Sequence, residues 1–187
     1  ARNTLGQTAV AVATLVNQQH AAGLDLNGAF GGELFAVGDV RTLPATGNGG
    51  SASVSVTRGD LAGLGTADYV LQYTGSAWTL AREDTGAPVG MSGSGTAADP
   101  FVADGMQIVV SAGAAAGDRF QIQPTRQAIA GMSVRISDPA KIAAAAPLVM
   151  SAAPANAGTA AFASSITLSG TADSCGSLEG KASTRSK

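Results

Sequence analysis

The chain holds very few residues that could carry out chemistry. Its 187 residues include one histidine, His20, and one cysteine, Cys175. A Ser-His-Asp or Cys-His site would have to use His20, and a cysteine-based zinc site needs more thiolates than one. Asp25 lies near His20 in sequence, but no nucleophile or oxyanion hole accompanies them. We therefore interpret His20 as a polar residue on the last turn of a helix, where its charged form suits the helix dipole.

The acidic residues and glycine-rich loops also lack the spacing of known sites. Glu83-Asp84 is the only adjacent acidic pair, and no calcium-binding loop pattern occurs. The glycine-rich stretches lack the spacing of phosphate-binding loops, and residues 90–94 miss the nucleophile-elbow pattern because position 94 is serine. The sequence therefore predicts no catalytic residue, no cofactor, no metal site and no enzyme.

A binding function is the alternative to a purely structural one. Arg58-Gly59-Asp60 matches a tripeptide that integrins bind, although a turn after a strand explains it as well. Tyr69, Tyr73 and Trp78 could form an exposed platform for stacking on sugars. We favour a place for these aromatic residues in a β-hairpin core, and keep a surface adhesion module as the alternative.

Composition excludes several classes of protein. Only 13% of the residues are charged, 4% are aromatic, and the net charge is −2. No basic cluster marks a nucleic-acid surface. The longest apolar runs, such as 9–16, are far shorter than the roughly 18 residues of a membrane span. With 25 glycines and many alanines, the core must be built largely from small side chains.

Residues 3–22 have the pattern of a helix with an apolar stripe. Leu5, Ala9, Val12 and Val16 are spaced by four, three and four residues, the rhythm of a helix–helix seam. We expect this stripe to pack against partner helices during assembly. Asn3 or Thr4 is expected to cap the start of the helix, and Gly23 to end it in a left-handed conformation.

The residues after about position 50 indicate antiparallel strands. Residues 53–57 alternate polar and apolar, and 69–73 with 78–80 predict a hairpin around the turn 74–77. A second hairpin is expected between 106–110 and 119–123, with a short strand at 133–137 and a mobile loop at 86–98. The predicted core consists of Tyr69, Leu71, Tyr73, Trp78, Leu80, Ile108, Val110, Phe120 and Ile122.

These elements predict an α+β, mainly β fold, in which a small antiparallel β domain of hairpins is attached to the end of a long axial helix. Residues 1–27 form the helix end and its cap, and residues 28–147 form the β-rich outer domain. That domain closes with a short helix, 140–146, begun by Asp138-Pro139. We expect residues 148–187 to be a tail rich in small residues, partly disordered, with a weak strand at 165–168 and non-native residues at its end.

Two segments resemble a known family. Residues 14–28 read Thr-Leu-Val-Asn-Gln-Gln-His-Ala-Ala-Gly-Leu-Asp-Leu-Asn-Gly. Residues 116–126 read Ala-Gly-Asp-Arg-Phe-Gln-Ile-Gln-Pro-Thr-Arg, and Asp-Pro-Ala-Lys-Ile-Ala-Ala-Ala follows at 138–145. In type, order and spacing these segments resemble the central part of the flagellar hook-associated protein 1 family, over about residues 3–146.

The resemblance implies a structural subunit of the bacterial flagellum at the junction between hook and filament. It implies export through the flagellar type III apparatus and an extracellular place in the flagellum. The implied partners are further copies in a ring, the hook protein, the next hook-associated or filament proteins, and an export chaperone that binds a terminus absent from this chain. The implied partners include no nucleic acid and no membrane. Since the terminal segments drive polymerisation in that family, the isolated chain is expected to be monomeric.

Overall fold

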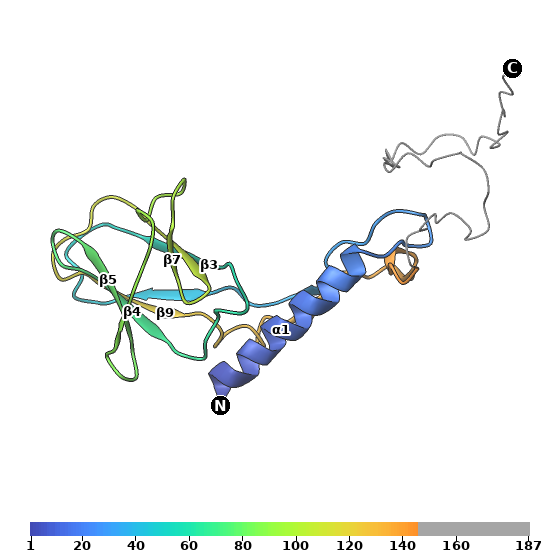
Figure 1. Cartoon of the computed structure of the whole chain (residues 1–187), viewed down its shortest axis with the longest axis horizontal. Helices are drawn as coiled ribbons and strands as arrows, with labels where there is room; N and C mark the ends of the chain where they lie inside the picture. The colour runs from blue at the N-terminus through green and yellow to red at the C-terminus, as the bar shows by residue number, and fades with distance from the viewer. Residues whose placement is uncertain (146–187) are drawn as a thin grey trace, which may run out of the picture. The chain divides into compact units, whose positions relative to one another are not determined.

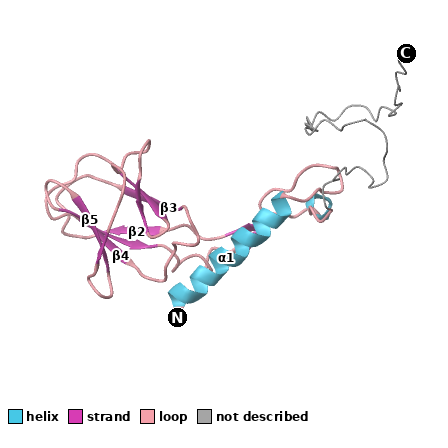
Figure 2. Cartoon of the chain, in the orientation of Figure 1, coloured by secondary structure: helices cyan, strands magenta, loops and turns pink. Residues whose placement is uncertain are grey.

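The structure, a computed structural model, describes residues 1–145. It contains one long helix, α1 (Arg2–Ala21), and antiparallel strands that pair in three sheets (Figures 1 and 2). This agrees with the predicted α+β, mainly β class. The predictions for residues 146–187, which include the tail, the strand at 165–168 and Cys175, lie outside the described residues.

The two ends of α1 differ from the prediction. Ala1, and not Asn3 or Thr4, is the N-cap, and alanine has no side-chain oxygen that could accept a capping bond. Asn3 lies inside the first turn, and its amide reaches across to another part of the fold. Ala22 at the other end is right-handed, with φ −83°, and the glycine after it does not adopt a left-handed conformation. Gly23 is needed there for space, since a Cβ at this position would lie 2.3 Å from the carbonyl oxygen of Ala143.

The largest sheet has five strands in the order β2-β9-β4-β5-β6. Its members are β2 (Arg41–Pro44), β9 (Arg119–Gln123), β4 (Tyr69–Tyr73), β5 (Trp78–Arg82) and β6 (Pro88–Val89). A three-stranded sheet has the order β3-β8-β7, with β3 (Val54–Arg58), β8 (Met106–Val110) and β7 (Phe101–Ala103). β1 (Phe35–Ala36) pairs with β10 (Ser133–Val134), and a 3₁₀ turn η1 (Pro139–Lys141) follows.

The first predicted hairpin is confirmed. β4 and β5 pair with Leu71 opposite Leu80 and Tyr73 opposite Trp78. The turn closes through mutual bonds between Thr74 and Ala77. Local turn chemistry and alternation are sufficient to specify this unit.

The second predicted hairpin is wrong. β8 pairs with β3 and β7, whereas β9 pairs with β2 and β4 in the other sheet. The connection 111–117 therefore passes from one sheet to the other. The strand that forms a hairpin with β8 is β7. The two are joined by the turn Asp104-Gly105, where φ is 41° and 74°. An Asp-Gly pair is a strong signal for such a turn because both residues tolerate positive φ.

Two other predicted segments are more ordered or shorter than expected. The region 86–98, predicted to be a mobile loop, contains β6, which pairs with β5, and Ser92, which forms a bridge to Val102. The predicted helix at 140–146 is replaced by η1 at Pro139–Lys141. Asp138 caps it as expected, accepting a 3.0 Å hydrogen bond from the Ala140 amide.

One buried cluster joins the two larger sheets. Six of the predicted core residues are buried in it: Tyr69, Leu71, Leu80, Ile108, Phe120 and Ile122. Tyr73, Trp78 and Val110 are only half-buried. Val10 of α1 belongs to the same cluster, so the helix packs on the β domain along its N-terminal half and is not joined to it merely at one end.

Candidate assembly surface

The two faces of α1 have different environments. The inner face is built from small residues and is buried, at Gly6, Ala9, Val10 and Ala13. The outer face carries Leu5, Val12 and Leu15, whose exposed fractions are 55%, 46% and 63%. Large aliphatic side chains this exposed are uncommon in a row on one helix, and they mark a surface that burial would stabilise.

The predicted stripe is divided between these two faces. Leu5 and Val12 lie on the outer face, Ala9 is buried against the β domain, and Val16 is half-buried. We call Leu5, Val12 and Leu15 the outer helix face.

Two shallow apolar hollows flank the outer helix face. One, about 320 Å³, lies between α1 and the turn after β3, and is lined by Gln7, Thr8, Ala11, Val12, Leu15, Leu61 and Leu64. The other, also about 320 Å³, is lined by Leu15, Val16, Gln19, His20, Leu34 and Ala143. Leu15 lies between them, and neither hollow contains an acidic or basic side chain other than His20. Both therefore suit an apolar neighbour.

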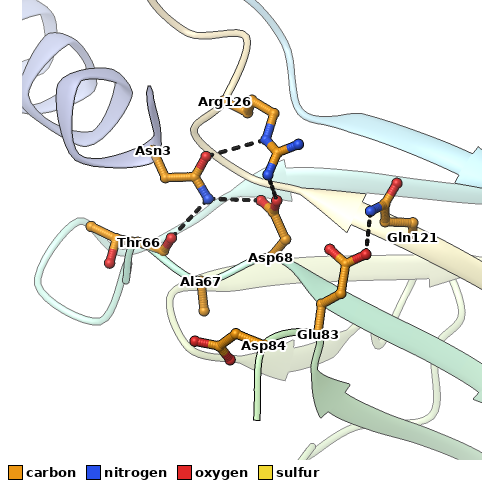
Figure 3. A pocket seen from close by; sticks show the side chains of 8 residues that line it. All are labelled: Asn3, Thr66, Ala67, Asp68, Glu83, Asp84, Gln121 and Arg126. Carbon is orange, nitrogen blue, oxygen red and sulfur yellow. Dashed lines mark hydrogen bonds and ion pairs between the residues drawn. The ribbon is translucent and has the colours of Figure 1, made fainter. Parts of the chain in front are cut away.

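A polar cluster fixes the start of α1 on the β domain (Figure 3). Asn3 donates to the Thr66 carbonyl oxygen (2.8 Å) and to the Asp68 carboxylate (3.0 Å), and its own oxygen accepts from Arg126 Nε (3.3 Å). Arg126 also forms an ion pair with Asp68. We call Asn3, Asp68 and Arg126 the helix lock.

The carboxylate of the helix lock is buried. Burial raises the pKa of Asp68, and this outweighs the opposite effects of Arg126 and of the Asn3 hydrogen bond. The neighbouring Glu83 and Asp84 raise the pKa further. The charged form of Asp68 is thus held by only one cation and one amide, which makes those two contacts structurally important.

The three residues of the helix lock line a hollow of about 420 Å³, and the adjacent acidic pair Glu83-Asp84 lines it too. Glu83 accepts a 2.5 Å hydrogen bond from Gln121, and the carboxylate of Asp84 points away from that of Glu83 (Figure 3). The two groups do not converge on a shared point, as paired acid–base catalysis requires. Among residues 1–145, no three His, Cys, Asp or Glu side chains come together in a way that could hold a metal ion.

A close backbone approach lies next to the helix lock. The inner face of α1 meets the backbone of Thr125 at Gly6, where a Cβ would lie 1.9 Å from the Thr125 carbonyl oxygen. Gln7 adds a 2.6 Å bond to the Leu64 carbonyl oxygen. The roles of Asn3, Gly6 and Arg126 were not predicted from the sequence. A glycine inside a helical pattern was the available signal, since it costs helix stability unless contact requires it.

The residues of the adhesion alternative are largely used within the fold. Arg58 donates to the carbonyl oxygens of Pro124 (2.8 Å) and Gly38 (2.5 Å), and its half-burial lowers the pKa of the guanidinium. Tyr69 is buried and donates to Asp104 (2.9 Å). Tyr73 and Trp78 lie 5.1 Å apart between ring centroids, and Trp78 packs on Phe120 at 6.0 Å. The three aromatic residues do not share an exposed platform.

Comparison with known proteins places these features in a family. Residues 1–35 match the model described as "Flagellar hook-associated protein FlgK helical domain", and residues 43–124 match "Flagellar hook-associated protein 1, D2-like domain". Flagellar hook-associated protein 1 of Escherichia coli (strain K12) is 35% identical over 144 residues, which is 77% of this chain. The chain belongs to the flagellar hook-associated protein 1 family.

Other members of the hook-associated protein 1 family agree. The Salmonella typhimurium protein is 32% identical over 146 residues. The structure of the flagellar hook junction protein FlgK from Burkholderia pseudomallei superposes with a TM-score of 0.71 at 38% identity, covering 78% of this chain and 26% of that one. The chain spans about a quarter of the length of the curated relatives it matches, 26% of each. The first matched region ends at residue 35, in β1, and the second begins at residue 43, in β2, where α1 and its loop give way to the two larger sheets.

None of the helices in the described part of the chain combines the length and apolarity needed to cross a bilayer.

Proposed function

We propose that this chain is part of a structural subunit of the bacterial flagellum, at the junction between hook and filament. Membership of the hook-associated protein 1 family, whose member from Burkholderia pseudomallei is a flagellar hook junction protein, supports this proposal. The subunit acts outside the cell after export by the flagellar apparatus. It is not an enzyme.

The outer helix face is the observation that carries the proposal. Leu5, Val12 and Leu15 are about half-exposed in a single chain, so burying the rest of each side chain is worth roughly half of the 1.5–3 kcal/mol of a complete burial. In the assembled junction this face packs against helices of the complete subunit and of its neighbours, in keeping with Leu5 and Val12 of the predicted stripe, whereas Ala9 is already buried within the chain. The helix lock and the close contact at Gly6 then fix the position of the β domain relative to the helix.

The partners follow from the place of the subunit in the flagellum. They are further copies in a ring, the hook protein, and the next hook-associated or filament protein. An export chaperone binds a terminus outside this chain. The isolated 187-residue chain, which holds the outer helix face without the rest of the subunit, stays monomeric.

Immunogold electron microscopy on intact flagella tests the location. Antibodies raised against the β domain, residues 43–124, should label a narrow band between hook and filament. Flagella from a strain lacking the gene are the control for specificity. Label spread over the cell surface would refute the junction assignment and favour the adhesion alternative.

A further inference from the structure

His20 is buried, although it lies at the end of a helix, where the sequence predicts a polar residue whose charged form suits the helix dipole. It lies on the last turn of α1, yet its side chain is 5% exposed. Two segments far apart in the chain converge on its ring: the loop that leaves α1, and the segment that returns after β10. Gly31 packs so closely here that a Cβ would lie 2.5 Å from the ring nitrogen Nδ1 and 2.6 Å from the Cβ of Ala143.

Both ring nitrogens of His20 are engaged, and the partners fix their roles. Nε2 lies 2.9 Å from the amide nitrogen of Ala143, which can only donate. Nδ1 lies 2.8 Å from the carbonyl oxygen of Gly32, which can only accept. The ring must therefore be neutral, with its proton on Nδ1 and a lone pair on Nε2. A protonated ring would place an N–H against the N–H of Ala143.

The returning segment has few other attachments at this point. Leu24 and Ala145 exchange two backbone hydrogen bonds, of 2.8 and 3.2 Å, and Leu26 donates to Ala140 at 3.1 Å. A buried amide that loses its acceptor and finds an N–H in its place incurs the full desolvation penalty of an unsatisfied donor. That cost is comparable to the contribution of these few bonds, so the segment can detach locally without unfolding of the sheets.

The charged groups on the surrounding elements are occupied elsewhere. In the loop, Asp25 accepts from the amides of Asn27 and Ala29, and Glu33 forms an ion pair with Arg135. In the returning segment, Asp138 caps η1, and the positive charge of Lys141 lowers the pKa of Asp25. Within the described residues, none of these groups forms a hydrogen bond or ion pair with His20. A proton on Nε2 would thus gain no acidic side chain as a partner among residues 1–145, where the helix dipole is the one favourable influence on it.

We propose that His20 is a proton-sensitive latch that holds residues 140–145 against the end of α1. The neutral ring closes the latch through Ala143. A proton added to Nε2 opens it and releases the returning segment, while the β domain keeps its fold. The latch controls how firmly residues 140–145 are bound to the end of α1. It does not depend on the assembly role proposed above.

Amide hydrogen exchange on the whole 187-residue chain tests the latch. Protection factors, corrected for the intrinsic effect of pH, are measured at pH 7.5 and 5.0 for Ala143 and Ala145, with Ile108 and Ile122 as reporters of the β domain. We expect protection at Ala143 and Ala145 to fall at least tenfold at pH 5.0 while the two reporters change less than twofold. A long-range ¹H–¹⁵N spectrum at pH 7.5 should show the ring protonated at Nδ1.

Two variants make the test specific. His20→Gln keeps an acceptor for the Ala143 amide that gains no proton in this range, so protection should be independent of pH. His20→Phe removes the acceptor, so protection should be low at both pH values. The proposal is overturned if wild-type protection does not depend on pH, if His20→Gln shows the same dependence, or if Ile108 and Ile122 lose protection together with Ala143.

Discussion

Asn3, in the first turn of α1, donates a 3.0 Å hydrogen bond to the carboxylate of Asp68, which lies 65 residues later in the chain, immediately before β4. Asn3 is not the N-cap, because the helix begins one residue earlier with Ala1 in that position. Its amide instead holds the first turn of the helix on the β domain. The orientation of α1 is therefore set by long-range polar contacts as well as by apolar packing.

Removal of this amide should weaken the fold. In Asn3→Ala, Asp68 loses a donor, Thr66 loses a bond to its carbonyl oxygen, and Arg126 loses an acceptor. We expect the free energy of unfolding to fall by about 1–2 kcal/mol, measured by urea denaturation. Arg2→Ala, at an exposed neighbouring position, is the control and should change it by less than about 0.5 kcal/mol. Equal stability of the two variants would contradict the helix lock.

Gly6 should resist a substitution that ordinarily stabilises helices. Gly→Ala in a helix interior gains about 1 kcal/mol from propensity alone. Here the new Cβ would lie 1.9 Å from the carbonyl oxygen of Thr125, and overpacking of this kind costs about 1–3 kcal/mol or more. We expect Gly6→Ala to lower stability in urea denaturation, whereas Thr4→Ala at an exposed position of the same helix should not. A stabilised Gly6→Ala protein would mean that α1 does not approach Thr125 closely.

The Arg58-Gly59-Asp60 sequence should behave as structure and not as a ligand. Arg58 joins β3 to the carbonyl oxygens of Gly38 and Pro124 with two different nitrogens of its guanidinium. Arg58→Lys keeps the charge but cannot make both bonds in the same geometry, so we expect a loss of about 1 kcal/mol in stability. The folded chain should not compete with an Arg-Gly-Asp peptide for integrin binding. Competition by the folded chain, together with unchanged stability of Arg58→Lys, would support adhesion.

The stability of the β domain should depend on Asp118 at acid pH. This carboxylate accepts from the amides of Ala115 (2.8 Å), Gly49 (2.8 Å) and Gly50 (3.3 Å), and these bonds lower the pKa of Asp118, Ala115 most strongly. A depressed pKa in the folded state stabilises the fold above the ordinary carboxyl value, and this stability is lost as pH falls through the folded value. Asp68, whose pKa is raised, acts in the opposite direction.

Comparison of Asp118→Asn with the wild type isolates this effect. We expect the urea midpoint of the wild type to fall more than that of Asp118→Asn between pH 5 and pH 3, with the variant less stable at pH 5. The same decrease in both proteins would show that Asp118 is not the group responsible. Asp99→Asn, at an exposed acidic residue, controls for the loss of one negative charge.

Local patterns in the sequence predicted the helix and the β4–β5 hairpin because neighbouring residues determine both. The pairing of β8 and β9 could not be predicted in this way, since these strands are neighbours in sequence but belong to different sheets. The Asp104-Gly105 pair indicates a turn, but β7 before it is only three residues long, too short for its pattern to predict a strand. At the candidate surface, the spacing of Leu5 and Val12 predicted an apolar row, while the roles of Asn3, Gly6 and Arg126 depend on contacts more than 60 residues apart in sequence.

The most direct test of the account places a charge on the outer helix face of the complete junction protein. Val12→Asp is compared with Gln18→Asp, which puts the same charge on an exposed position of the same helix outside the outer helix face. Both proteins are expressed in a strain lacking the gene, and electron microscopy scores filaments joined to hooks. We predict that Gln18→Asp supports filaments and that Val12→Asp leaves bare hooks, although its secreted β domain still folds by circular dichroism. Normal junctions with Val12→Asp would contradict the assembly role of this face.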